Sequence, residues 1–153
     1  LPHWQGVVVG EASGEEARPG GFTDELRDTV EREALAHRVV FAGFRRDMAQ
    51  CLQAVDIACV PSVKEAFGLS VIESMAAKCA VVGSDSGAIP ELIDRDRGRI
   101  ADPADSSAWT AALAELVADA ELRDHLAAVA SDWVSTRFTL EGHVGKLVGY
   151  YRG

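Results

Sequence analysis

Two glutamates flank a glycine-containing stretch that could bind an anionic ligand. Glu65 follows a short apolar run, and Glu73 lies in the next expected helix, which begins near Gly68. The first amides of a helix have no partner within the helix, and the positive end of the helix dipole adds to their attraction for anions. The amides of Gly68, Leu69 and Ser70 are therefore expected to face an anionic group such as a diphosphate. Gly68 is also expected to let a ligand approach the backbone, because it has no side chain.

The carboxylate of Glu73 is expected to reach the same ligand, because helical side chains lean toward the N-terminus of their helix. Helical periodicity predicts one polar and one apolar side for this segment. The polar side is expected to hold Ser70, Glu73, Ser74 and Ala77. The apolar side, which must face a sheet, is expected to hold Leu69, Val71, Ile72, Met75 and Ala76.

Each of these residues also has a purely structural interpretation. Glu73 could be a solvated surface residue, and Glu65 could simply complement the helix dipole. Gly68 could be required only by a turn, and Ser62 could only cap the end of a strand. Spacing alone does not decide between these interpretations and a ligand site.

Short apolar runs alternate with helix-like segments along most of the chain. Strands are expected at residues 5–10, 39–42, 57–60 and 80–83. Helices are expected at residues 23–36, 47–54, 68–77, 89–93, 106–117, 120–136 and 140–151, the first capped by Thr23 and the fifth by Ser106 or Ser107. A hairpin-like turn is expected at residues 95–100. Apolar strands separated by helices predict an α/β fold, in which a doubly wound parallel sheet is covered on both faces.

Size and charge restrict the class of protein. The 153 residues are expected to form a single domain, 1–153, with its own core. The net charge of −9, from 15 basic and 24 acidic residues, argues against binding to nucleic acid or to anionic lipid. No apolar run is long enough to cross a membrane, and the first residues do not resemble an export signal, so a cytoplasmic location is expected.

Cysteine, histidine and tryptophan residues give no sign of a metal site. Cys51, Cys59 and Cys79 each lie in an apolar stretch and are expected to be reduced and buried. The four histidines are scattered without ligand spacing, so no metal is expected. Trp109 and Trp133 are each spaced with apolar residues along a helix, which predicts that both pack in the core.

Residues 65–73, EAFGLSVIE, resemble the E-x7-E signature of retaining glycosyltransferases of the GT-B type, in the form that marks the large family-four group. Three further segments resemble the same family in the same order: VVFAGF at 39–44, VDIACVPS at 55–62 and SMAAKCAVVGSDSGAIPELI at 74–93. The resemblance covers residues 6–138. It implies a Rossmann-like fold and, specifically, the C-terminal, donor-binding domain of such an enzyme.

The resemblance also implies roles for individual residues. Glu65 would bind hydroxyls of the transferred sugar as the catalytic residue, and Glu73 would accept hydrogen bonds from the ribose of the donor nucleotide. The sugar and its phosphate would be held by the amides of Phe67, Gly68 and Leu69. Further contacts would come from the base-binding loop at 44–47 and from the lining of the crevice, that is, from Phe44, Arg45, Asp47, Ser62 and Gly87. The donor would be a nucleotide-diphosphate sugar, with no metal or other cofactor.

The sequence departs from the family pattern in several places. The upstream strand that carries an arginine and a lysine for the diphosphate is absent before Gly6, and so is the acceptor-binding N-terminal domain. The chain alone is therefore expected to be inactive, and any membrane association is expected to come from the missing domain. Ala88 replaces the second glycine of a family pair and is expected to narrow the approach to the diphosphate. Lys78 replaces a usual glycine, which is expected to affect only a turn.

The final segment, residues 139–153, resembles the helix that braces the N-terminal domain in this family. It could equally be a surface helix with Leu147, Val148 and Tyr151 packed locally; exposed apolar residues would favour the bracing role. Two alternatives to a transferase domain remain open. One is a non-catalytic module of the same fold that binds sugar nucleotides or another protein. The other is a GT-B epimerase or phosphorylase, because fold alone does not identify function.

Overall fold

The computed structural model describes residues 4–10 and 21–152. The chain divides into two compact units, residues 1–48 and residues 49–153. Each unit contains parallel strands and helices, so the α/β class predicted from the sequence is confirmed. The strands form a two-stranded and a three-stranded sheet. That the whole chain acts as a single domain stays a prediction.

Among its described residues, the first unit contains two parallel strands and one helix. Strand β1 (Gly6–Val9) pairs with β2 (Val39–Gly43), and the register shifts between Val8 and Val9. Helix α1 (Phe22–Arg32) is shorter than expected, and its N-cap is Gly21 rather than Thr23. The guanidinium of Arg27 lies 4.3 Å from the centre of the Phe41 ring, so a cation–π contact links α1 to β2.

The second unit contains a three-stranded parallel sheet in the order β3-β4-β5. Strands β3 (Ile57–Val60) and β4 (Ala80–Ser84) lie where the sequence predicts them. Strand β5 (Arg99–Ala101) runs parallel to β4, so the hairpin expected at residues 95–100 is wrong. The chain instead turns at Asp94, where the amides of Arg97 and Gly98 both donate to the carbonyl oxygen, and then enters the strand.

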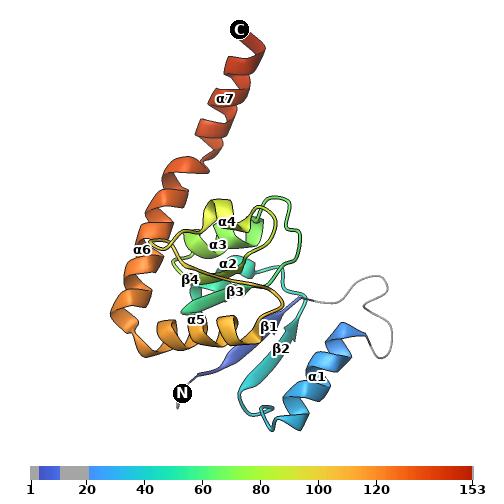
Figure 1. Ribbon diagram of the computed structural model, residues 1–153. Coiled ribbons are helices and arrows are strands. Elements are labelled where there is room, and N and C mark those ends of the chain that lie inside the picture. The colour runs from blue at the N-terminus through green and yellow to red at the C-terminus, as the bar shows by residue number, and fades with distance from the viewer. Residues whose placement is uncertain (1–3, 11–20, 153) are drawn as a thin grey trace. The chain divides into compact units, whose positions relative to one another are not determined.

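Helices cover both faces of this sheet (Figure 1). On one face, Val81 of β4 packs with residues of α3 (Leu69–Ala76), α4 (Ile89–Leu92) and α6 (Ala120–Arg137). On the other face, Ala80 and Val82 pack with α5 (Ser106–Ala118) and with the first turns of α6. Every residue of β4 is buried, because this central strand has helices on both sides. The remaining short helix, α2 (Met48–Gln53), lies before β3.

Side-chain caps fix the starts of the two long helices. The Asp105 carboxylate accepts from the amides of Ser107 and Ala108, so Asp105 caps α5, and the expected serine caps are wrong. Aspartate accepts these bonds well and also complements the helix dipole with its charge. Asp119 caps α6 in the same way, through the amide of Leu122.

The expected burial of the cysteines and tryptophans is only partly correct. Cys79 is buried and Cys51 is half-buried, but Cys59 on β3 is exposed. Strand β3 lies at the edge of the three-stranded sheet, which explains why an apolar strand leaves one side chain accessible. Trp109 and Trp133 are half-buried and pack at the margins of the two clusters. The Trp109 indole donates to the carbonyl oxygen of Asp102, so its polar end lies at the surface.

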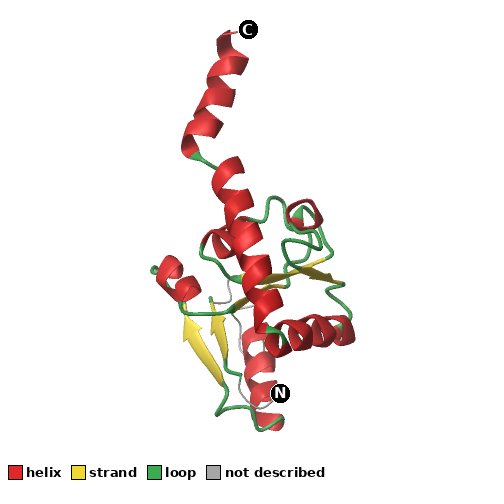
Figure 2. Ribbon diagram, turned by 90° about the vertical axis from the view of Figure 1, so that its left-hand side faces the viewer, coloured by secondary structure: helices red, strands yellow, loops and turns green. Residues whose placement is uncertain are grey.

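Helix α7 (Leu140–Arg152) leaves its apolar side chains exposed. Figure 2 shows that α7 continues beyond α6 after a short loop and extends past the other helices of its unit. Tyr150 and Tyr151 are 86% and 89% exposed, and Val144, Leu147 and Val148 are exposed as well. The alternative in which Leu147, Val148 and Tyr151 pack locally is therefore wrong. Within the described residues, no helix is both long and apolar enough to span a membrane.

Candidate functional site

Two loops meet at the carboxyl ends of the neighbouring strands β3 and β4. The first loop, residues 61–68, leads into α3, and the second, residues 85–88, leads into α4. The amide of Lys64 donates to the Ser86 hydroxyl at 2.9 Å, and the Ser84 hydroxyl donates to the carbonyl of Ser62. Because the strands are parallel and adjacent, each loop supports the backbone of the other.

Glu65 is held at its backbone by the second loop. The amide of Ala88 donates to the Glu65 carbonyl oxygen at 2.8 Å. Gly87 lies so close to the same peptide that an added Cβ would stand 2.1 Å from the Glu65 carbonyl oxygen. Gly87 also has a φ of 63°, a conformation that favours glycine. Gly87 therefore supports Glu65, a role that the sequence does not reveal.

The carboxylate of Glu65 is held by the loop that carries it. Its Oε1 accepts from the amide of Gly68 at 3.1 Å and from that of Phe67 at 3.3 Å. These bonds, from Gly68 first and then Phe67, lower the pKa of Glu65, with smaller help from the Ala66 amide and the Ser62 hydroxyl and against the opposing effect of desolvation. Glu65 thus presents an ionised, oriented carboxylate at the surface.

This arrangement changes the expected role of the loop amides. The amides of Phe67 and Gly68 were expected to face a ligand, but both donate to Glu65. Over the described residues, no hydrogen bond engages the amides of Leu69 and Ser70. Those two amides at the first turn of α3 remain available to an anion.

Gly68 is required for a reason other than ligand approach. It is the buried N-cap of α3, with φ 86° and ψ 40° in the left-handed region. A Cβ at this position would lie 2.6 Å from Cδ1 of Leu92. Backbone conformation and packing against α4 therefore require the glycine, and the expectation that Gly68 opens the backbone to a ligand stays a prediction.

The two sides of α3 differ from the helical-wheel prediction at several positions. Val71, Ile72 and Met75 are buried as expected, but Ser74 is buried too, while Leu69 is 57% exposed. Ala76 is exposed as well. Burial of Ser74 costs little, because its hydroxyl donates to the carbonyl oxygen of Ser70 at 2.7 Å.

Glu73 lies on the exposed side of α3, together with Leu69 and Ser70. Its carboxylate makes no hydrogen bond or ion pair with any residue that the structure describes. Unlike Glu65, it is therefore not fixed by the protein, and it can accept hydrogen bonds from a ligand.

The loop at residues 44–47 belongs to the first unit, whereas Glu65 belongs to the second. Arg45 and Asp47 form a two-point ion pair in which the guanidinium Nε lies 2.8 Å from Oδ1 and Nη2 lies 2.5 Å from Oδ2. This pairing lowers the pKa of Asp47. The Phe44 side chain is 64% exposed. Because the two charges compensate each other, this loop suits contacts through its backbone and through the Phe44 ring.

Several residues of the site were not found by sequence reasoning. Ser84 and Ser86 bond the two loops together, and Leu92 fills the space at Gly68. Lys64 has a φ of 59°, which is unusual for a residue with a side chain. No sequence pattern marks these contacts, because they depend on how the two loops meet.

Ala88 has right-handed backbone angles, φ −82° and ψ −8°, so its backbone does not need the glycine usual in the family.

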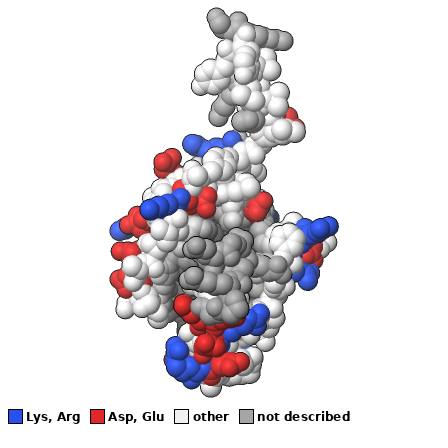
Figure 3. All heavy atoms as spheres, turned by 90° about the vertical axis from the view of Figure 1, so that its right-hand side faces the viewer, with Lys and Arg blue, Asp and Glu red and all other residues white. Residues whose placement is uncertain are grey.

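Charges of both signs are mixed on the face shown in Figure 3, where Lys and Arg side chains lie among Asp and Glu. The expectation that nucleic acid is not a partner stays a prediction. Within the described part of the chain, no three His, Cys, Asp or Glu residues lie close enough together to hold a metal ion.

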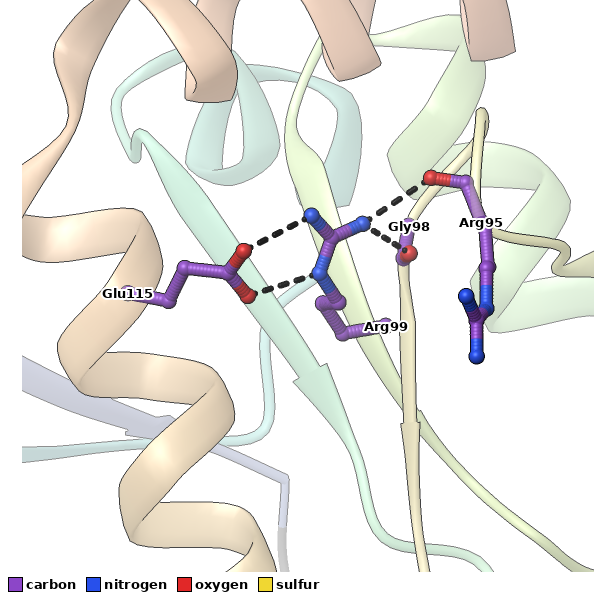
Figure 4. A network of polar contacts seen from close by, with 4 residues as sticks. All are labelled: Arg95, Gly98, Arg99 and Glu115. Carbon is purple, nitrogen blue, oxygen red and sulfur yellow. Dashed lines mark hydrogen bonds and ion pairs between the residues drawn. The ribbon is translucent and has the colours of Figure 1, made fainter.

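Arg99 serves the fold rather than the site. It begins β5, and its guanidinium donates to both carboxylate oxygens of Glu115 on α5, at 2.7 and 2.9 Å (Figure 4). It also donates to the carbonyl oxygens of Arg95 and Gly98, each at 2.9 Å. The site loops follow the carboxyl ends of β3 and β4, whereas Arg99 lies at the amino end of its strand. Its contacts join α5 to the sheet.

Parallel strands with helices on both faces, and polar loops at the strands' carboxyl ends, define a Rossmann-like α/β fold. It is the fold of the C-terminal domains of GT-B glycosyltransferases. The family of glycosyl transferases group 1 matches residues 2–119, and the chain belongs to this family.

Individual relatives agree with this assignment. The lipopolysaccharide core biosynthesis mannosyltransferase LpcC of Rhizobium leguminosarum bv. viciae is 32% identical over 149 residues, which cover 97% of this chain and 42% of that protein. The C-terminal domain of LpcC from Francisella tularensis is 34% identical, with a TM-score of 0.79 over 91% of this chain and 72% of that one. Anabaena HepE, solved in complex with UDP, has a TM-score of 0.92 at 25% identity and covers 99% of this chain and 42% of that one. The chain thus spans about two-fifths of the length of the Rhizobium LpcC and of HepE.

Proposed function

We propose that this chain is the donor-binding half of a retaining glycosyltransferase, and that it binds a nucleotide-diphosphate sugar at the loops 61–70 and 85–88. The observation that carries the proposal is the Glu65 carboxylate, which the loops fix at the carboxyl ends of two parallel strands. Membership of the glycosyl transferases group 1 family supports it. The HepE structures in complex with UDP and with UDP-glucose support it too.

Each part of the site has a role in this proposal. Glu65, ionised and held by its own loop, accepts hydrogen bonds from hydroxyls of the transferred sugar and positions the anomeric carbon. The amides of Leu69 and Ser70, at the positive end of α3, bind the distal phosphate. Glu73 accepts from the ribose hydroxyls, for which an unpaired carboxylate on the exposed side of the helix is suited.

Transfer requires more than this chain supplies. Departure of a nucleoside diphosphate needs stabilised negative charge, and the only donors assigned here are amides at one helix start. In the proposal, the two cations of the family pattern and the acceptor site come from the remainder of a longer protein, whose product is a glycan, glycolipid or polysaccharide. The chain by itself is expected to bind donor weakly and not to transfer sugar. No ligand to a metal ion is assigned.

Calorimetric titration with UDP, GDP and ADP and their sugar derivatives tests the proposal. Binding of at least one of them in the micromolar to millimolar range is expected. Glu73→Gln should weaken that binding about tenfold, because a hydrogen bond to a charged acceptor contributes roughly 1.5 kcal/mol. The matched control is Glu121→Gln on α6, an exposed glutamate outside the site, which should bind like the wild type. Absence of binding to every nucleotide at millimolar concentration would contradict the proposal.

The exposed apolar side chains of α7 fit a second part of the same proposal. We infer that α7 packs on the acceptor-binding domain of the longer protein, since Val144, Leu147 and Val148 are exposed here. Sedimentation of this chain alone should then show a monomer. A stable dimer that Leu147→Asp abolishes would instead favour a module whose function is association.

A further inference from the structure

An aromatic row connects the loop of Glu65 to the end of α6. The Phe67 ring meets the Phe138 ring edge to face, with centroids 6.1 Å apart and an angle of 79° between the rings. Phe138 in turn lies 5.5 Å from the centroid of Trp133. Phe67 belongs to the site loop, whereas Phe138 is the C-cap of α6. Residues far apart in the sequence are thus joined by ring contacts.

The Trp133 end of this row is fixed. Trp133 is half-buried against the core cluster of α3, α4 and α6, and the guanidinium of Arg97 lies 4.2 Å from its ring centre. Arg97 is itself held, because it pairs with Asp94 at 2.8 Å and donates to the carbonyl of Leu92 at 3.1 Å. The Trp133 ring therefore provides a rigid support for Phe138.

The Phe67 end of the row depends on that support. The Phe67 side chain is 55% exposed, and among the described residues Phe138 is the one ring that it contacts. The Phe67 amide donates to Oε1 of Glu65, so a change in the position of Phe67 also changes the donor to that carboxylate. An exposed phenyl ring without a partner would sample several rotamers. Contact with Phe138 restricts the ring and, through the backbone, the orientation of Glu65.

We propose that Phe138 is a positioning residue for Glu65, acting through the ring of Phe67. Phe138 contacts the ring of Phe67 and is assigned no contact with the donor; it keeps the loop in the conformation that presents the carboxylate. Because Phe138 lies between α6 and the exposed helix α7, a displacement of α7 is also expected to reach the site loop by this route. The expected effect of Phe138 on donor binding rests on the proposed function. Its expected effect on the conformation of the site loop does not.

Amide hydrogen exchange of the ligand-free chain, measured by NMR, tests the positioning role directly. Phe138→Ala should speed exchange at the amides of Phe67 and Gly68 by about two- to tenfold, since aromatic pairs contribute roughly 0.5–1.5 kcal/mol beyond their area. The amides of Lys64 and Ala88 should keep their rates, because they donate to the Ser86 hydroxyl and to the Glu65 carbonyl oxygen, bonds that do not involve the Phe67 ring. Phe138→Tyr should restore wild-type exchange, since an edge-to-face contact tolerates a hydroxyl on a partly exposed ring.

Two further variants keep the test decisive. Phe67→Leu, which removes the ring from the other side, should reproduce the exchange pattern of Phe138→Ala even if the latter folds poorly. Tyr150→Ala, at an 86% exposed aromatic, should leave all four amides unchanged. If the amides of residues 67 and 68 exchange at the wild-type rate in Phe67→Leu, the proposal is overturned. In Phe138→Ala and Phe67→Leu, the affinity for a nucleoside diphosphate should fall about two- to tenfold. If exchange is altered in these variants but even the wild type binds no nucleotide, the positioning role is upheld and the proposed function is contradicted.

Discussion

Gly87 and Glu65 are in backbone contact across two loops that the sequence separates by a helix and a strand. The space beside the Gly87 Cα is filled by the Glu65 peptide, whose nitrogen would lie 2.6 Å from a Cβ at position 87. The adjacent amide, that of Ala88, donates to the Glu65 carbonyl oxygen. The position of the proposed catalytic glutamate is therefore set by the loop after β4 as well as by its own loop.

Replacement of Gly87 should disturb Glu65. Gly87→Ala places a methyl group against backbone atoms that cannot rotate away and adds a side chain at a φ of 63°. Together these effects are expected to cost roughly 2–4 kcal/mol of unfolding free energy and to weaken nucleotide binding. The control is Gly10→Ala, which has φ 123° but nothing within 4 Å of the added Cβ. Chemical denaturation should show a smaller loss there; equal losses in the two variants would contradict the contact.

Lys78 offers the opposite change, a gain in stability. It follows the C-cap of α3 with a φ of 64°, and its amide and that of Cys79 donate to the carbonyls of Met75 and Ser74. This is the Schellman arrangement, in which the left-handed residue is usually glycine. Lys78→Gly should raise the unfolding free energy by about 0.5–1 kcal/mol, because the strain of a side chain exceeds the entropy cost of glycine.

The neighbouring residue provides the control for Lys78. Ala77 has an ordinary φ of −79°, so Ala77→Gly should destabilise the chain by about 0.5–1 kcal/mol. A thermal melt distinguishes the two variants by the direction of the shift. If Lys78→Gly lowers the melting temperature as Ala77→Gly does, the left-handed conformation is not costly there.

Glu65 should make stability depend on pH at acidic values. Its folded-state pKa lies below the ordinary value of 4.5, because the amides of Gly68 and Phe67 bond the charged form. The contribution of Glu65 to the unfolding free energy is therefore fully present at pH values above its ordinary pKa and is lost as the pH falls through the lowered pKa. Unfolding free energy measured from pH 7 to pH 2.5 should fall less steeply in Glu65→Gln than in the wild type. Identical profiles would show that Glu65 is not held by these amides.

Arg99 should affect stability without affecting ligand binding. Arg99→Met removes the pair with Glu115 and two bonds to carbonyl oxygens, and Glu115→Gln removes only the charge of the partner. Because Glu115 is partly exposed, its replacement should cost only about 0.5–1 kcal/mol, and that of Arg99 should cost more. Nucleotide affinity should remain unchanged in both variants. A large loss of affinity would place Arg99 in the site.

Much of the fold could be predicted because it depends on local patterns. The apolar runs at β3 and β4 and the amphipathic helices were located within a few residues. Strand β5 was missed because RDRGRI is polar, and the strand forms only through parallel pairing with β4. The N-cap at Asp105 shows that a correct helix start can be assigned to the wrong cap when several polar residues are adjacent.

The sequence suggests residues for the candidate site but not the contacts among them, and the role of these residues in binding stays a prediction. The structure brings Glu65, Gly68 and Gly87 together in the second unit. Their hydrogen bonds and close contacts depend on how two loops meet, which no spacing in the sequence expresses. The sequence does not show that the amides of Phe67 and Gly68 are already hydrogen-bonded. A carboxylate two or three residues away can either accept from them, as Glu65 does, or point outward.

The most direct test of donor binding at these loops is an NMR titration of the isotopically labelled chain with UDP-glucose and with GDP-mannose. We expect at least one of them to shift the amides of residues 65–70 and 86–88, with Leu69 and Ser70 among the largest changes, and Glu73→Gln to reduce the shifts at a given concentration. Shifts confined to other parts of the chain, or no shifts with either donor at millimolar concentration, would contradict the account.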